Sequence, residues 1–382
     1  MLEHKAKTVK TMSQQSPKML YRIIGMCFVA ALIVFVFNYF LINAFANENS
    51  NELTQQQQQV ANEMVTLIKE ISLTRAKHYG HVKRFNQVKT LGCVQAKFIV
   101  EEDIAPQLKL GLFSTEKTYP AYIRFASASK MDDTKKDLRG MSIKVMNTEH
   151  PVIWGTFGEQ DFILNNAPSL FVKNSEEFLD FIRAINDDKL WWFFVNPFNS
   201  HFRSLWAILQ ARDHHSSPLD IRYWSATPYQ LGSGAENAVK YTAKPCSNYS
   251  SELPDELYNG YLHDAMKSHL SNQSACFEFM VQSRIPNENM PIDNAAVVWS
   301  EESAPFVKVA TILIEPQIFH QANQIKHCED IAFNPWQSMA EHKPLGEMNK
   351  VRKEVYKQLA AFRQMQNHGT NSFVKKGGKN YE

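Results

Sequence analysis

Short segments in which apolar and polar residues alternate recur along most of the chain, and they constrain the fold more than any other feature. Successive side chains of a β-strand point to opposite faces of a sheet, so a strand with one buried face alternates in this way. Residues 94–100 show the pattern most clearly, with Val94, Ala96, Phe98 and Val100 on one face. The other predicted strands cover residues 122–125, 141–145, 162–164, 223–229, 238–243, 276–282 and 307–314.

Helical patterns occur in fewer places than strand patterns. The predicted helices cover residues 175–186, 200–213, 254–271 and 348–363. Many strands of mixed spacing, with helices gathered in two regions and at the C-terminal end, predict an α+β fold built on a closed or strongly curved sheet. We find no internal repeat and no linker composition that would divide residues 80–368.

An apolar run of 20 residues, 23–42, precedes this domain. As a helix it would be roughly 30 Å long, the thickness of a bilayer core. Residues 1–22 carry five Lys or Arg and one acidic residue, so the positive-inside rule predicts a single-pass membrane protein with a cytoplasmic N-terminus. The main domain would then lie on the outer, periplasmic or extracytoplasmic side. A cleaved signal peptide is the alternative, since Ala44-Phe45-Ala46 fits a cleavage site, but the run is long for that purpose.

The predicted organisation therefore has five parts. They are a cytoplasmic segment (1–22), a transmembrane anchor or signal sequence (23–46), a Gln-rich helical arm (47–77), the main domain (78–368) and a disordered tail (369–382).

Composition excludes several classes of function. The net charge of +2, from 41 basic and 39 acidic residues, gives no electrostatic footprint for nucleic acid. The five Cys form no Cys-x-x-Cys pair, so no zinc signature is present. Cys27 lies in the apolar run, and the other four are either thiols or form up to two disulfides.

The predicted helix at residues 348–363 carries the chemically most specific pattern. At 100° per residue, Arg352, Tyr356 and Arg363 fall in a narrow arc along the edge of an apolar stripe. A phenol ordinarily ionises near pH 10, but a nearby, always-charged Arg favours the phenolate. A phenolate is a ligand that ferric haem can use. On the helix alone, an ordinary amphipathic Tyr with two Arg reaching water is the preferred interpretation, and only the rest of the chain changes it.

Seven segments in order resemble the catalase superfamily, in particular a short bacterial branch that lacks the C-terminal helical extension. The resemblance covers roughly residues 75–368, and the whole ordered set is far more specific than any one motif. The segments are residues 84–93, 119–125, 137–144, 161–168, Phe178, 329–335 and Arg352-x-x-x-Tyr356 with Arg363. The resemblance implies an antiparallel β-barrel with flanking helices that binds haem b, an iron porphyrin.

The resemblance also implies a role for each matching residue. Tyr356 would be the axial ligand of the haem iron, with Arg352 holding it as phenolate. Asn165 would face a peroxide on the distal side, with Asn166 as the next choice. The remaining cofactor-binding residues would be Arg84, Arg124 and Arg363 at the haem propionates, and Phe178 stacked on the porphyrin.

The sequence departs from the family at one important position. Where the family has its distal His, this chain has Gln87. A catalase uses that His to move a proton between the two peroxide oxygens, and an amide does not titrate near neutral pH. General acid–base catalysis is typically worth 10²- to 10⁴-fold in rate. His78 and His81 lie just upstream, and a substitute His from that segment is a weaker alternative.

Three functions are consistent with these observations. The first is a membrane-anchored, exported haem enzyme acting on hydrogen peroxide or organic hydroperoxides, either peroxidase-like or a weak catalase. The second is a catalytically silent haem-binding sensor or carrier, and the third is a scaffold without haem. Two Arg desolvated beside a Tyr argue against the third, since they need a nearby anion. Whether the chain is an enzyme, which hydroperoxide it uses and whether it forms a homo-oligomer stay open.

Overall fold

A computed structural model describes residues 52–369 of the chain. The chain divides into two compact units, Met1–Thr54 and Gln55–Glu382, and every element named below lies in the second. The helices are α2 (Gln55–Tyr79), α3 (Ser175–Asn186), α4 (Leu190–Val195), α5 (Phe202–Ala211), α6 (Tyr261–Leu270), α7 (Ala322–Asp330) and α8 (Glu347–His368). Short 3-10 helices cover Pro106–Leu108, Gly111–Phe113, Pro218–Asp220, Ala235–Asn237 and Ala340–His342.

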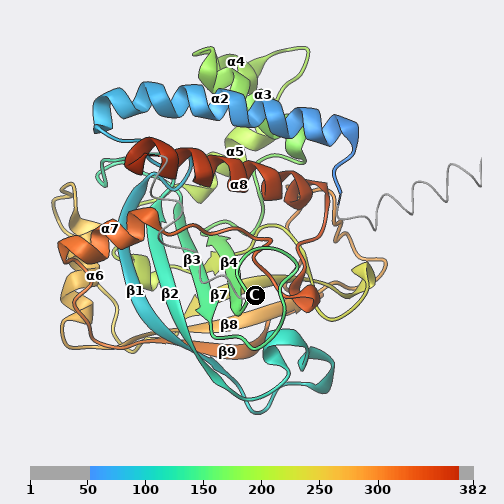
Figure 1. Cartoon of the computed structure of the whole chain (residues 1–382), viewed down its shortest axis with the longest axis vertical. Coiled ribbons are helices and arrows are strands. Elements are labelled where there is room, and N and C mark those ends of the chain that lie inside the picture. The colour runs from blue at the N-terminus through green and yellow to red at the C-terminus, as the bar shows by residue number, and fades with distance from the viewer. Residues whose placement is uncertain (1–51, 370–382) are drawn as a thin grey trace, which may run out of the picture. The chain divides into compact units, whose positions relative to one another are not determined.

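The strands form one antiparallel sheet that closes into a barrel (Figure 1). They are β1 (Lys89–Val100), β2 (Thr118–Ser127), β3 (Arg139–Met146), β4 (Glu159–Asn165), β5 (Tyr223–Trp224), β6 (Tyr229–Gln230), β7 (Ala238–Pro245), β8 (Ala275–Ser283) and β9 (Val307–Ile314). The order is β5-β4-β3-β2-β1-β9-β8-β7-β6, and a further pairing between β5 and β7 closes a ring of eight strands. The predicted antiparallel barrel with flanking helices is therefore confirmed.

The alternation in the strands separates the core from the functional surface. On β3, Met141, Ile143 and Val145 are fully buried in the barrel core. Ser142 and Lys144 point the other way because side chains alternate along a strand. Ser142 lines a cavity between the barrel and the helices, and Lys144 lines a separate groove.

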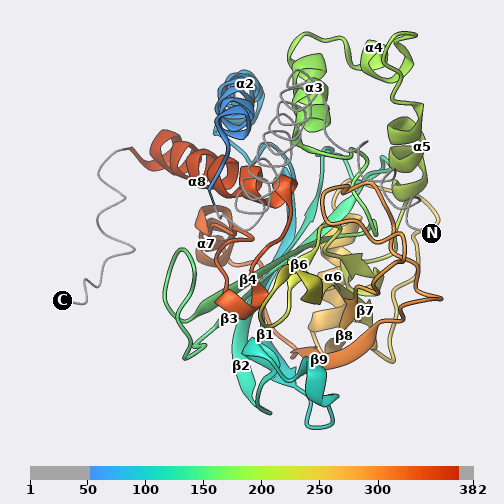
Figure 2. The same ribbon diagram turned by 90° about the vertical axis from the view of Figure 1, so that its right-hand side faces the viewer.

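Two long helices lie side by side over the barrel. α8 lies between α2 and the strands, as two perpendicular views show (Figures 1 and 2). Of the Gln-rich arm predicted at 47–77, the described part from Gln55 onward lies in α2, whose Ile68 and Ser72 reach the wall of the cavity. This helix therefore contributes to the cavity as well as preceding the barrel.

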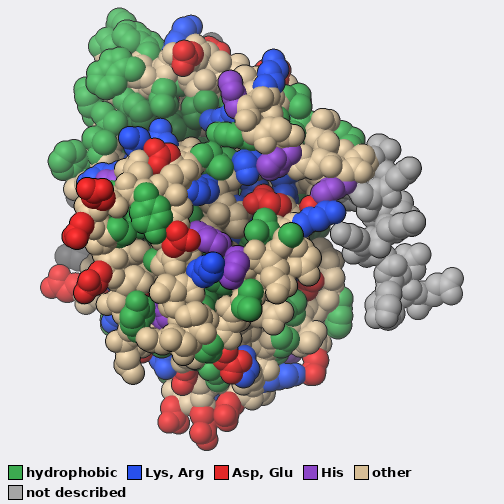
Figure 3. All heavy atoms as spheres, turned by 90° about the vertical axis from the view of Figure 1, so that its left-hand side faces the viewer, with side chains coloured by type: hydrophobic (Ala, Val, Ile, Leu, Met, Phe, Trp, Pro, Cys, Tyr) green, Lys and Arg blue, Asp and Glu red, His purple; other side chains and the backbone are tan. Residues whose placement is uncertain are grey.

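An apolar surface covers α4 and α5. Hydrophobic side chains gather at the upper left of Figure 3, where these helices lie. The patch includes Phe198, which is 95% exposed, and Trp191, Trp206 and Phe202 at about 60–70%. Patches of this kind commonly mark contact surfaces, because exposed aromatic area is costly in water. α4 packs through Phe193 and Phe194, and α5 through Leu205 and Ile208, on the cluster that also contains Met348.

Lys240 on β7 is a buried cation without an acidic partner. Its side chain is 4% exposed, and its Nζ donates to the Val297 carbonyl at 3.1 Å and lies 5.1 Å from the Trp299 ring. No carboxylate within residues 52–369 forms an ion pair with it. Burial lowers the pKa of Lys240 to about 7.

We therefore expect stability to rise with pH between about 7 and 10 because of Lys240. In that range the unfolded chain still binds a proton on this Lys while the folded chain does not, so the free energy of unfolding increases with pH. The increase should be on the order of 3 kcal/mol. Below pH 7 both states are protonated and the contribution is constant. Chemical denaturation of wild type and Lys240→Met from pH 6 to 10 measures this increase in the free energy of unfolding. The variant should be the more stable protein at pH 7.

Lys144 provides the matched control for that experiment. It is also buried, but its Nζ pairs with Glu159 at 2.7 Å and Asp161 at 2.8 Å. Lys144→Met should lower stability, because it leaves the buried carboxylate of Asp161 and the partly exposed one of Glu159 without their cation. A stability difference between Lys240→Met and wild type that stayed constant from pH 6 to 10 would contradict the assignment of the pH effect to Lys240.

The predicted location of the protein needs correction. Between residues 52 and 369, no helix has both the length and the apolar content required to cross a bilayer. This finding contradicts the prediction of a single-pass membrane protein with a cytoplasmic N-terminus and an external main domain. Residues 1–46, on which that prediction depended, and residues 370–382 of the predicted tail lie outside the described residues.

Candidate functional site

A cavity of about 260 Å³ lies between α8, α2, the segment before β1 and the ends of β3 and β4. It brings together all eight residues that the sequence analysis singled out. They are Arg84, Gln87, Arg124, Asn165, Phe178, Arg352, Tyr356 and Arg363. The apolar stripe of α8 faces the same space, since Met348, Val355, Leu359 and Phe362 also line the cavity. Helical spacing therefore places one face of α8 along the cavity, as the pattern indicated.

Arg352 is fixed against the Tyr356 phenol. Its Nη2 donates to the Tyr356 hydroxyl at 3.3 Å, and its guanidinium lies 5.2 Å from the ring centroid. Its Nη1 donates to Thr227 Oγ1 at 3.0 Å and to Asn349 Oδ1 at 2.9 Å. Burial alone would lower the pKa of Arg352, but the phenol groups of Tyr356 and Tyr229 raise it on balance. A permanent positive charge therefore lies next to the Tyr356 oxygen.

Tyr229 is a second buried phenol near the same guanidinium. Burial raises the pKa of Tyr229 to about 12, and the charge of Arg352 only partly opposes this effect. Tyr229 is not among the residues that line the cavity. Tyr356 is thus the phenol that combines the Arg352 contact with access to the cavity.

Three arginines converge at one end of the cavity, and we call Arg84, Arg124 and Arg363 the arginine cradle. Arg84 Nη2 donates to the Ile331 carbonyl at 2.6 Å and the Cys328 carbonyl at 3.3 Å. Arg363 donates to the Glu329 carbonyl and, at 3.5 Å, to Ile331. These acceptors are the last carbonyls of α7 and the residue after it. A helix C-terminus has unpaired carbonyls and a partial negative charge, so it is a natural site for guanidinium groups.

Arg124 reaches the cradle from the barrel. It is 2% exposed, and its Nη2 donates to the Gln87 carbonyl at 2.8 Å and to Thr90 Oγ1 at 2.8 Å. Its Nε is buried and has no hydrogen-bond partner within residues 52–369. Such an unpaired buried donor is rare and usually marks a missing acceptor.

The charges of the cradle do not cancel. Glu329 accompanies the three arginines, at 3.4 Å from Arg84, and its Oε1 accepts a hydrogen bond from Thr90 at 2.6 Å. Burial raises the pKa of Glu329, but Arg84, Thr90 and Arg124 lower it on balance, so this group is an anion. The next carboxylate, Asp330, also raises the pKa of Arg84 and Arg363. Three guanidiniums against these two carboxylates leave an excess of positive charge.

Burial lowers the pKa of all three arginines, and mutual repulsion adds to the effect at Arg84 and Arg124. Burial lowers the pKa of Arg84, and the charges of Arg124 and Arg363 lower it further. Burial lowers the pKa of Arg124 to about 10, with Glu329 opposing and Arg363 adding to the effect. Burial likewise lowers the pKa of Arg363, opposed by nearby carboxylates. An arrangement of this kind is relieved by a bound anion.

Gln87 and Asn165 face the cavity from the barrel side. Gln87 has a left-handed backbone, with φ of 59°, and its Oε1 is buried without a hydrogen-bond partner among the described residues. Its amide packs on Gly140, where an added Cβ would lie 2.3 Å from Oε1. Asn165 Oδ1 accepts from the Ala167 N–H at 2.8 Å, which leaves its Nδ2 group for the cavity. Asn165 therefore offers donors to the cavity, whereas the unused acceptor of Gln87 is packed against Gly140.

Three alternatives from the sequence can now be compared with the structure. Asn166, the second choice for a distal amide, is absent from the cavity wall and bonds the Arg139 N–H at 2.8 Å and the Ala211 carbonyl at 3.1 Å. His78 and His81 are exposed and do not line the cavity. Phe178 does line it, with its ring centroid 6.1 Å from that of Phe171.

Several residues of the site were missed by sequence reasoning. Asn349 lies one turn before Arg352 on α8, so helical spacing could have identified it as a partner. Thr227 and Thr90 come from distant segments, and no local pattern points to them. Within residues 52–369 there is also no cluster of three or more His, Cys, Asp or Glu that could hold a bare metal ion.

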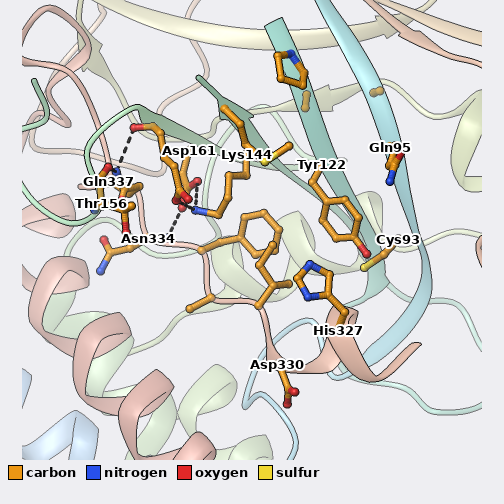
Figure 4. Close-up of a pocket in the computed structure, with 18 of the residues that line it drawn as sticks. Cys93, Gln95, Tyr122, Lys144, Thr156, Asp161, His327, Asp330, Asn334 and Gln337 are labelled. Atoms are coloured by element: carbon orange, nitrogen blue, oxygen red, sulfur yellow. Dashed lines mark hydrogen bonds and ion pairs between the residues drawn. The ribbon is translucent and has the colours of Figure 1, made fainter. Parts of the chain in front are cut away.

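A second, larger space of about 1480 Å³ lies outside the barrel, and we call it the outer groove. Figure 4 shows its wall, with Lys144 reaching Asp161, and Cys93 next to Tyr122 and His327. Asp161 Oδ2 accepts from the Asn334 N–H at 2.9 Å, and burial raises the pKa of Asp161 to about 6 although Lys144 opposes the shift. Tyr356 and Phe333 line both spaces, so only a thin wall separates the groove from the cavity.

Comparisons with known proteins agree on one family. The catalase family model matches residues 46–192. A catalase from Latilactobacillus sakei is 24% identical over 265 residues, which cover 62% of this chain and 53% of that protein. Catalase-1 from Triticum aestivum is 23% identical over 248 residues, covering 56% of this chain and 47% of the relative.

Solved structures show the same fold. Catalase A from Saccharomyces cerevisiae superposes with a TM-score of 0.60 at 16% identity, covering 77% of this chain and 63% of that one. A bacterial catalase gives a TM-score of 0.57 at 17% identity, covering 81% and 65%. The chain thus spans about half the length of the curated relatives it matches.

Proposed function

The chain belongs to the catalase superfamily, and on that premise we propose that its cavity binds haem, with Tyr356 as the axial ligand of the iron. The bound haem would act on hydrogen peroxide or an organic hydroperoxide. The observation that carries the proposal is the arginine cradle, whose excess of positive charge and forked donors suit the propionate carboxylates of a haem. The residues present therefore fit this cofactor.

The proximal side supports the same assignment. The Tyr356 hydroxyl accepts from Arg352 at 3.3 Å and faces the cavity. Phenolate is an axial ligand used by haem proteins of this type. Thr227 and Asn349 hold the Arg352 guanidinium in place, so its charge stays at the phenol oxygen. Ligand orientation by such partners is commonly worth 10- to 100-fold in affinity.

The distal side determines what a bound haem could do. Haem would supply a redox-active iron, and the surrounding residues would supply hydrogen bonds and proton transfer. Asn165 Nδ2 can donate a hydrogen bond to a hydroperoxide oxygen, and the Gln87 amide can accept one from the O–H once its side chain turns away from Gly140. Neither amide can take up the proton. We therefore propose slow dismutation of hydrogen peroxide and peroxidase-like use of hydroperoxides.

A second candidate function is haem binding without turnover, as in a sensor or carrier. The observation that favours it is Gln87 itself, because no described His replaces the missing proton shuttle at the cavity. In both cases the arginine cradle and Tyr356 have the same roles, and only the distal chemistry differs.

Titration of the full chain with ferric haem tests the shared part of both candidates. We expect a Soret band that saturates at one haem per chain, with a ferric phenolate charge-transfer band. Haem dimethyl ester is the matched control, since its side chains carry no charge. It should bind at least about 10-fold more weakly, because each charge-assisted hydrogen bond contributes on the order of 1.5–3 kcal/mol.

The outcomes separate the candidates. No spectral change with either compound would reject haem binding. Equal affinity for haem and its ester would reject the cradle as the propionate site. If haem binds as expected, hydrogen peroxide and cumene hydroperoxide turnover, normalised to bound haem, separates the enzyme from the silent haem protein.

A further inference from the structure

A disulfide between Cys93 and Cys328 joins the barrel to the arginine cradle. Cys93 lies on β1, and Cys328 lies in the last turn of α7. The carbonyl of Cys328 itself accepts from Arg84, and the following carbonyls at Glu329 and Ile331 accept from Arg84 and Arg363. The bond therefore fixes the helix end that positions two of the three cradle arginines.

The same strand positions the third arginine. Cys93 is the cross-strand partner of Arg124 in the register of β1 and β2. Three residues earlier, Thr90 accepts from Arg124 and donates to Glu329. Within residues 52–369, this Thr90–Glu329 contact is the only hydrogen bond we find between β1 and α7. Without the disulfide, α7 would keep a single polar link to the strand.

The disulfide is largely buried, with Cys93 4% and Cys328 2% exposed, but its Cys93 side borders a space that a reductant can enter. Cys93 lines the outer groove, next to Tyr122 and His327 (Figure 4). The groove volume of about 1480 Å³ accommodates a small dithiol. Arg84, bonded to the Cys328 carbonyl, places a cation beside the residue that would leave as thiolate, and nearby cations stabilise thiolates.

We propose that Cys93–Cys328 is a redox-modification site, which a small dithiol reduces from the outer groove, and that its reduction weakens the binding of carboxylates by the arginine cradle. The inference rests on the proposed binding of haem in the cavity. Retention of haem would then depend on whether the Cys93–Cys328 disulfide is oxidised or reduced.

The reduction balances without any further reactant. A thiolate of the dithiol attacks Cys93 Sγ and breaks the bond to Cys328, which leaves as a thiolate. The second thiol of the reductant then displaces Cys93 from the mixed disulfide. The protein gains two electrons and two protons, and the dithiol loses the same number as it closes to a cyclic disulfide.

The chain offers a matched control in its second disulfide, Cys246–Cys276. Cys246 follows β7 and Cys276 lies in β8, and neither lines the cavity or the outer groove. Removing this pair also removes one cross-link, but it leaves the cradle unchanged. Any general effect of losing a disulfide should appear whichever of the two pairs is removed.

The test measures haem release from the loaded full chain into excess apomyoglobin. We expect dithiothreitol to accelerate release from wild type at least 10-fold. The double variant Cys93→Ser/Cys328→Ser should release haem as fast without dithiothreitol and show no further response to it. Cys246→Ser/Cys276→Ser should retain haem like wild type and still respond. Iodoacetamide labelling followed by peptide mass spectrometry should find Cys93 and Cys328 alkylated in the accelerated sample.

Haem dimethyl ester separates a change in the cradle from simple loosening of the fold. Its release should not respond to dithiothreitol, because it has no carboxylates for the cradle. Equal acceleration for haem and ester, an unchanged rate in wild type, or Cys93 and Cys328 that stay unlabelled would each overturn the inference. These results leave the proposed function intact, whereas a chain that never takes up haem rejects both. If the Ser variant does not fold, the labelled wild type still decides the question.

Discussion

Tyr356→Phe is expected to abolish tight binding of ferric haem while leaving the fold intact. The substitution removes one oxygen from a residue that lines the cavity. Arg352 keeps its hydrogen bonds to Thr227 and Asn349, so its guanidinium stays in place. The arginine cradle is unchanged and would still attract the propionates. We expect haem affinity to fall by on the order of 10²-fold or more, with loss of the phenolate charge-transfer band.

Tyr229→Phe is the matched control for this prediction. Tyr229 is a fully buried phenol near the same Arg352, but it lies outside the cavity wall, and its hydroxyl has no hydrogen-bond partner in the described chain. This variant should bind haem with the wild-type spectrum. Thermal unfolding of both variants without haem checks that neither has lost the fold. A Tyr356→Phe protein with an unchanged spectrum would show that another residue is the axial ligand.

Much of the barrel could be predicted because alternation is a local property of each strand. The predictions at 94–100, 141–145 and 307–314 lie within or coincide with β1, β3 and β9. The prediction at 223–229 merged β5 and β6, each two residues long, which are separated by a stretch with Ala226 at φ of 59°. Such short strands exist through pairing with β4 and β7, and this pairing leaves no periodic pattern in the sequence.

Helices were harder to predict where they are short. α3 has the predicted bounds, and its N-cap is Asn174, whose side chain accepts from the Glu177 N–H. The six residues of α4 are apolar throughout, so periodicity could not distinguish a helix from a strand. α7 is nine residues long and mostly polar, and tertiary contacts at its C-terminal carbonyls contribute to its position.

Some residues of the site could likewise be predicted from the sequence, and others could not. Helical spacing connected Arg352, Tyr356 and Arg363, since they share one element. Arg84 and Arg124 joined them only through resemblance to a family, because no local pattern links residues so far apart. The supporting groups, Thr90 and the carbonyls of α7, became apparent only in three dimensions. The disulfide pairing could not be deduced from the spacing of the Cys residues.

Gln87→His is expected to raise hydrogen peroxide turnover per bound haem by about 10²- to 10⁴-fold, the usual contribution of general acid–base catalysis. The backbone at this position can accept the change, because His is among the residues that tolerate a left-handed φ. Gly140 has no Cβ and so leaves room for a ring where the amide now packs. An imidazole with an ordinary pKa near 6.5 can accept the proton from one peroxide oxygen and return it to the other.

Gln87→Asn isolates the contribution of proton transfer in this prediction. It changes the size and reach of the side chain but keeps an amide that does not titrate, so turnover should stay within a few-fold of wild type. The His variant should also acquire a pH dependence of turnover between about pH 5 and 8, which wild type and the Asn variant lack. An equal gain in both variants would mean that space, rather than a proton shuttle, limits the reaction. No gain in a fully haem-loaded His variant would show that Gln87 does not occupy the distal position, and the slow dismutation proposed for the wild-type chain would then need another cause.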